Sequence, residues 1–171
     1  MRFKLPYVAG ALLLCITALS PAQQFPSKPI RMIVPFPPGG SVDTVARLIA
    51  PKMSETLGQS VVLDNRAGAS SNIGMEAVAR AAPDGYTLLI NTVPIVANPA
   101  LFPNISFNPQ RDFAPVSLVV DGASILFVHP SVPVRNMKEL VALAKARPGT
   151  LKFTSSGAGT LPHLATELLR Y

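Results

Sequence analysis

The sequence predicts an α/β fold built from repeated strand, loop and helix units. The first observation is an almost continuous apolar run at residues 30–34, followed by a Pro/Gly turn and by apolar residues at helical spacing up to Gly58. The second is that strand, Ser/Gly-rich loop and helix recur from Leu151 onward. An apolar run of this kind is typical of a strand in a parallel sheet that is covered on both faces.

The composition is that of a globular chain. Of the 171 residues, 49% are hydrophobic and 14% are charged, which is too apolar for a disordered segment. The net charge is +6, but the Lys and Arg residues are scattered along the chain and form no basic cluster with interleaved aromatic residues. Because such clusters are typical of nucleic-acid-binding proteins, we expect no nucleic-acid partner.

The N-terminal segment has the pattern of a secretory signal peptide. Arg2 and Lys4 precede an apolar stretch over residues 8–19, and small residues follow up to Ala22. We predict cleavage after Ala22, so that residues 1–22 form the signal peptide. The apolar stretch is too short to span about 30 Å of hydrocarbon as an anchor. Export without an anchor predicts a periplasmic location.

Further strand and helix patterns follow in the order that a parallel sheet requires. Apolar runs predict strands at residues 61–63, 86–90, 113–120, 125–128 and 151–154. Helical spacing predicts helices over residues 73–82, 137–147 and 161–171, and a short helix or turn over residues 94–102. Residues 103–111 are expected to be irregular. Ser70, Ser71 and Asn72 are N-cap candidates for the helix over residues 73–82.

A polar break at residues 121–124 predicts where the chain crosses into a second lobe. The predicted domains are the signal peptide, a first α/β lobe over residues 23–120 and the start of a second lobe over residues 121–171. The last helix has an apolar face, but no further strand follows it. We therefore expect the second lobe to be incomplete in this chain.

Two loops, at residues 36–43 and 155–160, are suited to bind an anion. Each follows a predicted strand and opens a helix, so each offers main-chain amides and the positive end of a helix dipole. Charge-assisted hydrogen bonds contribute about 1.5 to 3 kcal/mol each, whereas association costs at least about 4 kcal/mol. A micromolar affinity corresponds to about −8 kcal/mol, so it requires both loops.

Four blocks of sequence carry a resemblance to a known family. They are PFPPGGSVD, DNRAGASSNIG, DGYTLL with NTVPIVANPAL, and FTSSGAGTLPHLATEL. Together they resemble the Bug-type solute-binding proteins, the extracytoplasmic receptors of tripartite tricarboxylate transporters. The resemblance implies a periplasmic binding protein fold of type II with two Rossmann-like lobes, a monomer without a cofactor, and membrane transporter subunits as partners. It also implies that this chain is an N-terminal portion of such a receptor, for which we expect little or no binding by the portion alone.

The resemblance also implies which residues hold the solute, a small carboxylate. In the family, main-chain amides of the first loop and main-chain or hydroxyl groups of the second loop bind one carboxylate. By position, the predicted ligand-binding residues are Phe36, Gly39, Gly40, Ser41, Ser155, Ser156, Gly157 and Thr160, with Asn91 and Thr92 as secondary candidates. Ala158 stands where many relatives have a polar residue.

Enzymatic functions are disfavoured by the sequence. The chain has no G-x-S-x-G nucleophile elbow and no dinucleotide or P-loop motif. With two His residues and one Cys, Cys15 in the leader, it lacks the ligands of a zinc or Cys/His site. Asp43 is interpreted as a helix cap, and His163 as a residue in packing or local hydrogen bonding. We predict no catalytic residues and no metal site.

The predicted function is therefore an extracytoplasmic receptor that captures a small carboxylate for a tripartite tricarboxylate-type transporter. Two alternatives stay open at this point: a periplasmic adaptor whose closure is sensed by a membrane sensor, and a non-functional remnant. A hydrolase-like enzyme is the least favoured interpretation. The sequence does not identify the carboxylate.

Overall fold

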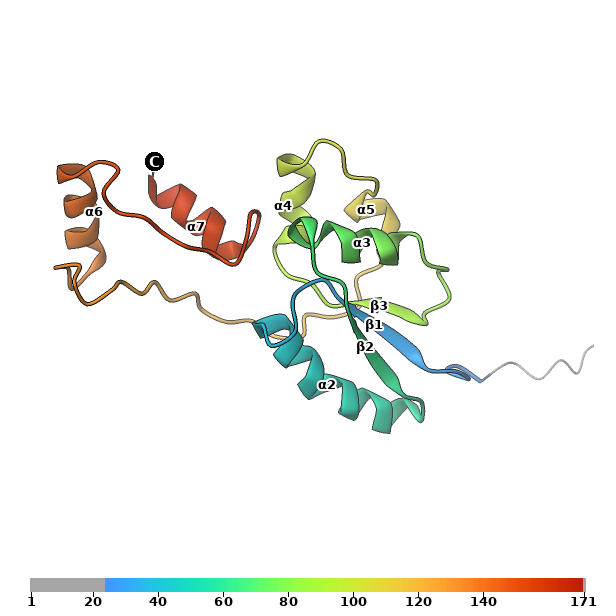
Figure 1. Cartoon of the computed structure of the whole chain (residues 1–171). Coiled ribbons are helices and arrows are strands. Elements are labelled where there is room, and N and C mark those ends of the chain that lie inside the picture. Colours follow the sequence, from blue (N-terminus) through green and yellow to red (C-terminus); the bar gives the residue numbers. More distant parts are fainter. Residues whose placement is uncertain (1–23, 171) are drawn as a thin grey trace, which may run out of the picture.

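The computed structural model describes residues 24–170 (Figure 1). The strands are β1 (Ile30–Val34), β2 (Val61–Asn65) and β3 (Thr87–Leu89). The helices are α2 (Ser41–Leu57), α3 (Asn72–Ala79), α4 (Pro94–Leu101), α5 (Pro109–Asp112), α6 (Met137–Ala146) and α7 (Leu161–Arg170), and a 3-10 turn, η1 (Ala69–Ser71), precedes α3. The predicted signal peptide lies outside the described residues. None of the helices within residues 24–170 has both the length and the apolarity needed to cross a membrane.

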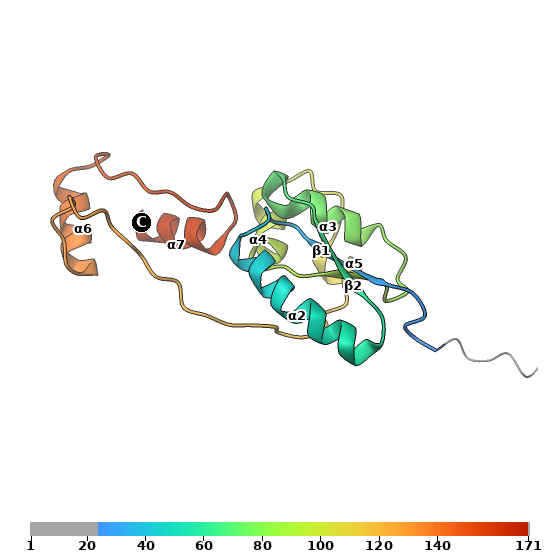
Figure 2. The ribbon, with the colours of Figure 1, turned by 60° about the horizontal axis from the view of Figure 1, so that its bottom comes forward.

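The strands form one parallel sheet in the order β2, β1, β3. The central strand β1 pairs Ile30 with Val61 of β2, and Arg31 with Thr87 of β3. Helix α2 connects β1 to β2, and α3 connects β2 to β3. The two helices lie on opposite faces of the sheet (Figures 1 and 2). The predicted α/β fold with a parallel sheet is confirmed.

The centre of the core is β1, because helices cover it on both faces. Met32 and Val34 pack with Ala46 of α2 and with Ile90 on one side of the sheet. Ile33 alternates to the other side and is 1% exposed. Full burial of a side chain of this size contributes about 1.5 to 3 kcal/mol. The loop that follows β1 therefore starts from the most firmly held part of the chain.

The helices form where the apolar spacing predicts them, but the start of α3 differs from the prediction. None of the N-cap candidates accepts a hydrogen bond as a side-chain cap of α3. Instead, Ala69, Ser70 and Ser71 all have positive φ angles, of 45°, 55° and 74°. Three successive non-glycine residues in the left-handed region are costly, so neighbouring contacts must hold this turn in place.

Residues 103–111, expected to be irregular, contain the start of the short helix α5. Asn108 caps it, because its Oδ1 accepts hydrogen bonds from the amides of Gln110 at 2.9 Å and Arg111 at 3.2 Å. The sequence N-P at residues 108–109 places a good N-cap before a proline, which is a recognised start signal for a helix. The signal was present in the sequence and was missed.

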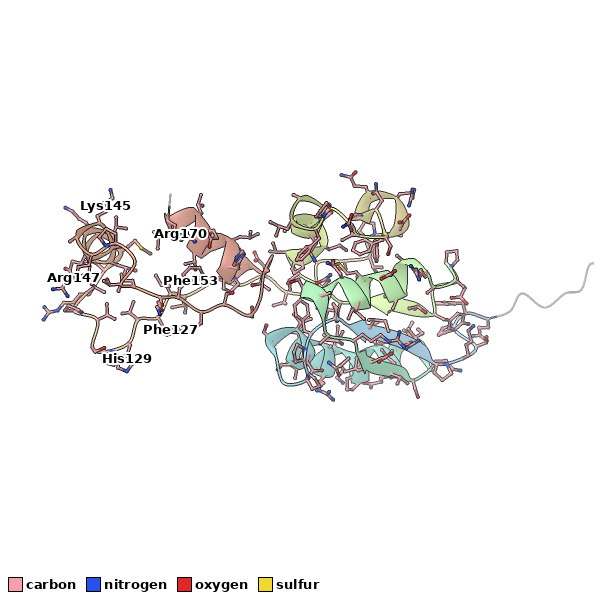
Figure 3. The ribbon with its side chains drawn as sticks, turned by 45° about the horizontal axis from the view of Figure 1, so that its top comes forward. Phe127, His129, Lys145, Arg147, Phe153 and Arg170 are labelled. Atoms are coloured by element: carbon pink, nitrogen blue, oxygen red, sulfur yellow. The ribbon has the colours of Figure 1, made fainter. Side chains whose placement is uncertain are left out.

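The three strands predicted after residue 112 are wrong. Residues 113–120, 125–128 and 151–154 form no strand, and nearly all of their side chains are exposed. Phe127, which is 82% exposed, and Phe153 lie in this part of the chain, away from the sheet (Figure 3). An apolar run becomes a strand only where a neighbouring strand pairs with its backbone. Within residues 24–170 no strand pairs with these runs.

The C-terminal segment, defined here as residues 137–170, lies to one side of the sheet unit, residues 24–112 (Figures 1 and 2). An extended stretch over residues 113–136 connects the two. No residue of α6 or α7 is buried. In the loop before α7, however, Gly159 and Thr160 are buried, and this loop lies beside α4.

Candidate functional site

The first loop, predicted at residues 36–43, spans residues 35–40 in the structure and joins β1 to the N-terminus of α2, which begins at Ser41. Its prolines cannot donate to the sheet ladder, and Gly39 has a φ of +81°, which glycine adopts without a steric cost. Gly40 is the N-cap residue, in an extended conformation with φ −72° and ψ 168°, and Ser41 is the first helical residue. The Ser41 side chain does not cap the helix, since α2 has no side-chain hydrogen bond at its N-cap.

The first turn of α2 presents main-chain donors at the end of the sheet. The amides of Ser41 and Val42 have no preceding carbonyl of the helix to accept them. Ser41 is exposed and Val42 is half-buried. The helix dipole makes this end electropositive, so it favours the oxygen of an anion.

Asp43 holds the first loop in shape from one turn inside α2. Its carboxylate is 1% exposed. Oδ2 accepts hydrogen bonds from the Gly39 amide and from Arg47 Nε, both at 2.8 Å, and Oδ1 accepts one from Asn65 Nδ2 at 2.9 Å. Asp43 was interpreted as a helix cap, but Gly40 occupies the N-cap position and α2 has no side-chain hydrogen bond there. The Asp43 carboxylate instead binds the amide of Gly39, the residue before the N-cap. The bond to Asp43 also occupies the amide of Gly39, one of the predicted ligand-binding residues.

Arg47 and Asn65 were missed as supports of the loop. Asn65 Nδ2 also donates to the Phe36 carbonyl at 3.2 Å, so it ties the end of β2 to the loop after β1. Two signals were available in the sequence. Arg47 stands four residues after Asp43, the spacing of a helical ion pair, and Asn65 is the first polar amide after a predicted strand. The hydrogen bond from Arg47, followed by those from the Gly39 amide and Asn65, lowers the pKa of Asp43 well below its ordinary value.

We expect the Asp43→Asn variant to be less stable than the wild type at neutral pH, and to lose this deficit in acid. Because the pKa of Asp43 is depressed in the folded state, its stabilising effect is fully present above the unfolded-state value of about 3.9. It is lost as the pH falls through the folded-state value. In urea unfolding, the difference in stability between the two proteins should be constant above about pH 5 and should shrink below about pH 4.

The matched control is Asp121→Asn, which changes the net charge equally in the exposed connecting stretch. It should leave the pH dependence of stability as in the wild type. If the wild-type and Asp43→Asn curves stay parallel down to about pH 2, the ionised Asp43 carboxylate does not stabilise the fold.

Asn91 and Thr92 follow β3 at the same edge of the sheet as the first loop. Since β1 and β3 are adjacent and parallel, their carboxyl ends open on one side. Asn91 Oδ1 accepts a hydrogen bond from the Thr92 amide at 2.8 Å. The Nδ2 group of Asn91 is buried and has no partner among the described atoms. An unpaired buried donor at this edge is available to a ligand oxygen or to water.

The second loop, residues 155–160, resembles the first loop in its geometry. The Gly159 amide lies 3.4 Å from Nδ1 of His163, four residues later, as the Gly39 amide bonds to Asp43. Gly157 N donates to Ser155 Oγ at 3.3 Å, and Thr160 Oγ1 donates to the Gly157 carbonyl at 2.6 Å. His163 therefore takes part in local hydrogen bonding, as interpreted from the sequence.

The predicted site residues of the second loop differ in exposure. Ser155, Ser156 and Gly157 are exposed, whereas Thr160 is buried. The Thr160 hydroxyl donates its proton within the loop. The backbone carbonyl of Thr160 accepts a hydrogen bond from the Leu164 amide at 3.0 Å. The exposed hydroxyls of Ser155 and Ser156 are thus better placed to meet a solute than Thr160.

Two of the hollows on the described part of the chain are well enough formed to describe, and neither contains a predicted site residue. One, of about 380 Å³, lies over β1 and β2 and includes Arg31, Val62 and Asp64. The other, of about 370 Å³, lies between α3 and residues 102–107. The first loop and residues 91–92 share one edge of the sheet, and the second loop meets the sheet unit at α4. A cleft shared by the two loops remains a prediction.

No group of three or more His, Cys, Asp or Glu residues within the described range is arranged to hold a metal ion. The donors at the predicted site are main-chain amides, hydroxyls and a side-chain amide. Such groups suit an anionic oxygen, since they donate hydrogen bonds and carry no negative charge.

Comparison with solved structures defines the class of protein. The chain resembles MatC from Rhodopseudomonas palustris, solved with bound malate, with a TM-score of 0.76 and 34% identity over 85% of this chain and 51% of that one. It also resembles a second R. palustris protein, solved with adipate, with a TM-score of 0.74 and 37% identity over 85% of this chain and 49% of that one. The periplasmic binding protein BugD matches with a TM-score of 0.70 and 33% identity, over 86% of this chain and 50% of that one. The fold is that of the periplasmic binding proteins.

The family follows from the sequence. The model of the tripartite tricarboxylate transporter family receptors matches residues 45–171, and the chain belongs to this family. It is 45% identical to the UPF0065 protein in the tcbD-tcbE intergenic region of Pseudomonas sp., over 95% of this chain and 49% of that protein. It is 43% identical to protein BugT of Bordetella pertussis, over 91% of this chain and 48% of that protein. The chain thus spans about half the length of these relatives. The predicted family resemblance is confirmed.

Proposed function

We propose that this protein acts as an extracytoplasmic receptor that captures a small carboxylate in the periplasm and delivers it to a tripartite tricarboxylate-type transporter. The observation that carries the proposal is the first turn of α2, where the amides of Ser41 and Val42 have no acceptor in the helix and meet the positive end of its dipole. Relatives of the same fold were solved with malate and with adipate, both dicarboxylates. The proposed role is binding and delivery, without catalysis.

The proposed site uses donors from both parts of the chain. From the sheet unit, the Ser41 amide approaches one carboxylate, with the half-buried Phe36 as an apolar wall and Asn91 Nδ2 as a further donor. The Gly40 amide donates to the Pro37 carbonyl at 3.4 Å, so Gly40 contributes the extended conformation that precedes the helix. Gly39 contributes its left-handed conformation, because its amide is bonded to Asp43. The second loop contributes Ser155, Ser156 and Gly157. The proposed lobes are residues 23–120 and 121–171.

The test is a titration of the ¹⁵N-labelled chain with malate and with adipate, followed by NMR. We expect saturable shifts of the Ser41, Val42 and second-loop amides at millimolar solute or above, since this chain covers about half of its relatives. The uncharged dimethyl malate serves as a control and should cause no such shifts. Malate-dependent shifts that are confined to amides outside these two loops would contradict the proposal.

The sharpest variant is Ser41→Pro, compared with Ser41→Ala. Proline is well tolerated at the first position of a helix, and the extended conformation of Gly40 suits a residue before proline. Ser41→Pro therefore removes the amide donor and the hydroxyl while it keeps α2, whereas Ser41→Ala removes the hydroxyl alone. One charge-assisted bond of about 1.5 to 3 kcal/mol predicts roughly tenfold or more weaker binding by Ser41→Pro than by Ser41→Ala. Equal binding by the two variants would exclude the Ser41 amide as a ligand donor.

A further inference from the structure

Asn98 of α4 is the most deeply buried polar residue of the sheet unit, with an exposed fraction of 0%. Its Nδ2 group donates to the Ser70 carbonyl at 2.7 Å and to Asn72 Oδ1 at 2.8 Å. These bonds connect α4 to the left-handed turn and to the first residue of α3. They fix the Asn98 side chain in one orientation, because both protons of the amide group are used.

The other end of the same side chain faces the second loop. Asn98 Oδ1 is buried and has no hydrogen-bond partner among the described atoms. A Cβ atom placed on Gly159 would lie 2.5 Å from this oxygen and 3.3 Å from Leu101 Cδ1. Gly159 also has a φ of +75°, in the left-handed region. Only glycine allows the loop to approach α4 this closely.

The contact is also the one place where the described chain after residue 107 becomes buried. No residue from Asn108 to Ala158 is buried, and none from Leu161 to Arg170 is buried. Gly159 and Thr160 alone in residues 108–170 are buried. The position of the second loop relative to the sheet unit is therefore set at these two residues and at the connecting stretch.

We propose that Asn98 is a positioning residue that seats the second loop on the sheet unit, with Gly159 as the residue shaped to fit it. The two hydrogen bonds from Nδ2 hold Oδ1 still, so that a side chain at position 159 displaces the loop rather than the asparagine. Asn98 does not touch the solute in this assignment. It acts by placing Ser155, Ser156 and Gly157 relative to the first loop. The inference deepens the proposed function and rests on it only for the consequence for solute binding.

The test measures amide hydrogen exchange in the absence of any solute. The Thr160 amide should exchange roughly tenfold faster or more in Gly159→Ala than in the wild type, because overpacking frees the loop from α4. Protection of the amides of β1, β2 and β3 should not change, since the sheet unit is not altered. The NMR signals of the Asn98 side-chain amide should shift in the same variant, which reports on the contact itself.

Gly149→Ala is the matched control. Gly149 also has a φ of +75°, but nothing lies within 4 Å of the position of its Cβ. The Gly149→Ala variant has the same backbone strain as Gly159→Ala but no contact with Asn98. It should therefore leave the Thr160 exchange rate and the Asn98 side-chain signals as in the wild type. In an Asn98→Ala background, Gly159→Ala should have a smaller effect on Thr160 exchange than in the wild-type background, because the obstructing oxygen is gone.

Equal acceleration of Thr160 exchange by Gly159→Ala and Gly149→Ala would overturn the assignment, since backbone strain alone would then explain both. Additive effects of Asn98→Ala and Gly159→Ala would overturn it as well. Because no solute is present, these outcomes are separate from a failure of the malate titration. If both proposals hold, Gly159→Ala should also reduce the malate-dependent shifts of the Ser41 and Val42 amides.

Discussion

The Gly74→Val variant will lose about 3 kcal/mol of unfolding free energy, the upper part of the range for overpacked cores. Gly74 is buried in α3, where a Cβ atom would lie 2.6 Å from Pro35 Cβ and 3.0 Å from both Pro35 Cα and the Arg66 carbonyl oxygen. Two of these three atoms belong to the backbone, so they cannot move aside by a change of rotamer. Replacing glycine in a helix with a better helix former gains at most about 1 kcal/mol, which does not offset the clash. Urea unfolding followed by circular dichroism measures the loss.

Gly122→Ala is the control for this prediction. Gly122 lies in the exposed connecting stretch, and nothing is within 4 Å of the position of its Cβ. The free energy of unfolding of Gly122→Ala should stay within about 0.5 kcal/mol of that of the wild type. A Gly74→Val protein as stable as Gly122→Ala would show that α3 does not pack closely against the end of β1.

The Ile33→Ala variant will lose about 2 to 5 kcal/mol of unfolding free energy, through lost burial and the cavity that remains. Ile33 is 1% exposed and lies in the central strand, where its backbone carbonyl also accepts the Ile90 amide at 3.1 Å. Because helices cover both faces at β1, the neighbours have little freedom to fill the space. The shift in the midpoint of urea unfolding between the variant and the wild type gives the change in unfolding free energy, provided that the two proteins have the same slope of free energy against urea concentration.

Val62→Ala removes a branched side chain from the edge strand beside β1 and serves as the control. Val62 is 52% exposed, so its truncation should cost less than about 1 kcal/mol. If Ile33→Ala and Val62→Ala cost the same, the described burial of β1 does not determine the stability of the sheet unit.

The first loop was predictable from the sequence because its signals are local. The apolar run of β1, the prolines and the glycine pair specify the strand end and the turn, and Gly58, with a φ of +66°, ends α2 where a C-cap glycine is expected. The role of Asp43 was also accessible, since only a helix start and a carboxylate in its first turn were needed. The roles of Arg47 and Asn65 were harder to predict. The contact from Arg47 depends on its side-chain rotamer, and the contact from Asn65 depends on the parallel register of β1 and β2.

The strands predicted after residue 112 failed for the opposite reason. Val116, Leu118, Ile125 and Phe127 have the side chains of a strand, but a strand exists only with a partner, and composition does not specify the partner. The left-handed turn before α3 was not predictable either. Ser70 and Ser71 are residue types that favour the N-cap position, so the local sequence does not reveal their positive φ angles. The Ser70 carbonyl accepts a hydrogen bond from Asn98, which stands 28 residues later in the chain.

The carboxylate of Asp43 has one more consequence for the proposed site. Its negative charge sits inside the electropositive end of α2 and is paired with Arg47, whose charge is of the opposite sign. Seen from a distance, the charges of Asp43 and Arg47 cancel, so only the partial positive charge of the helix dipole attracts a solute before it arrives. Discrimination among anions then depends on the fit of oxygen atoms to fixed donors at close range, where added salt has little effect.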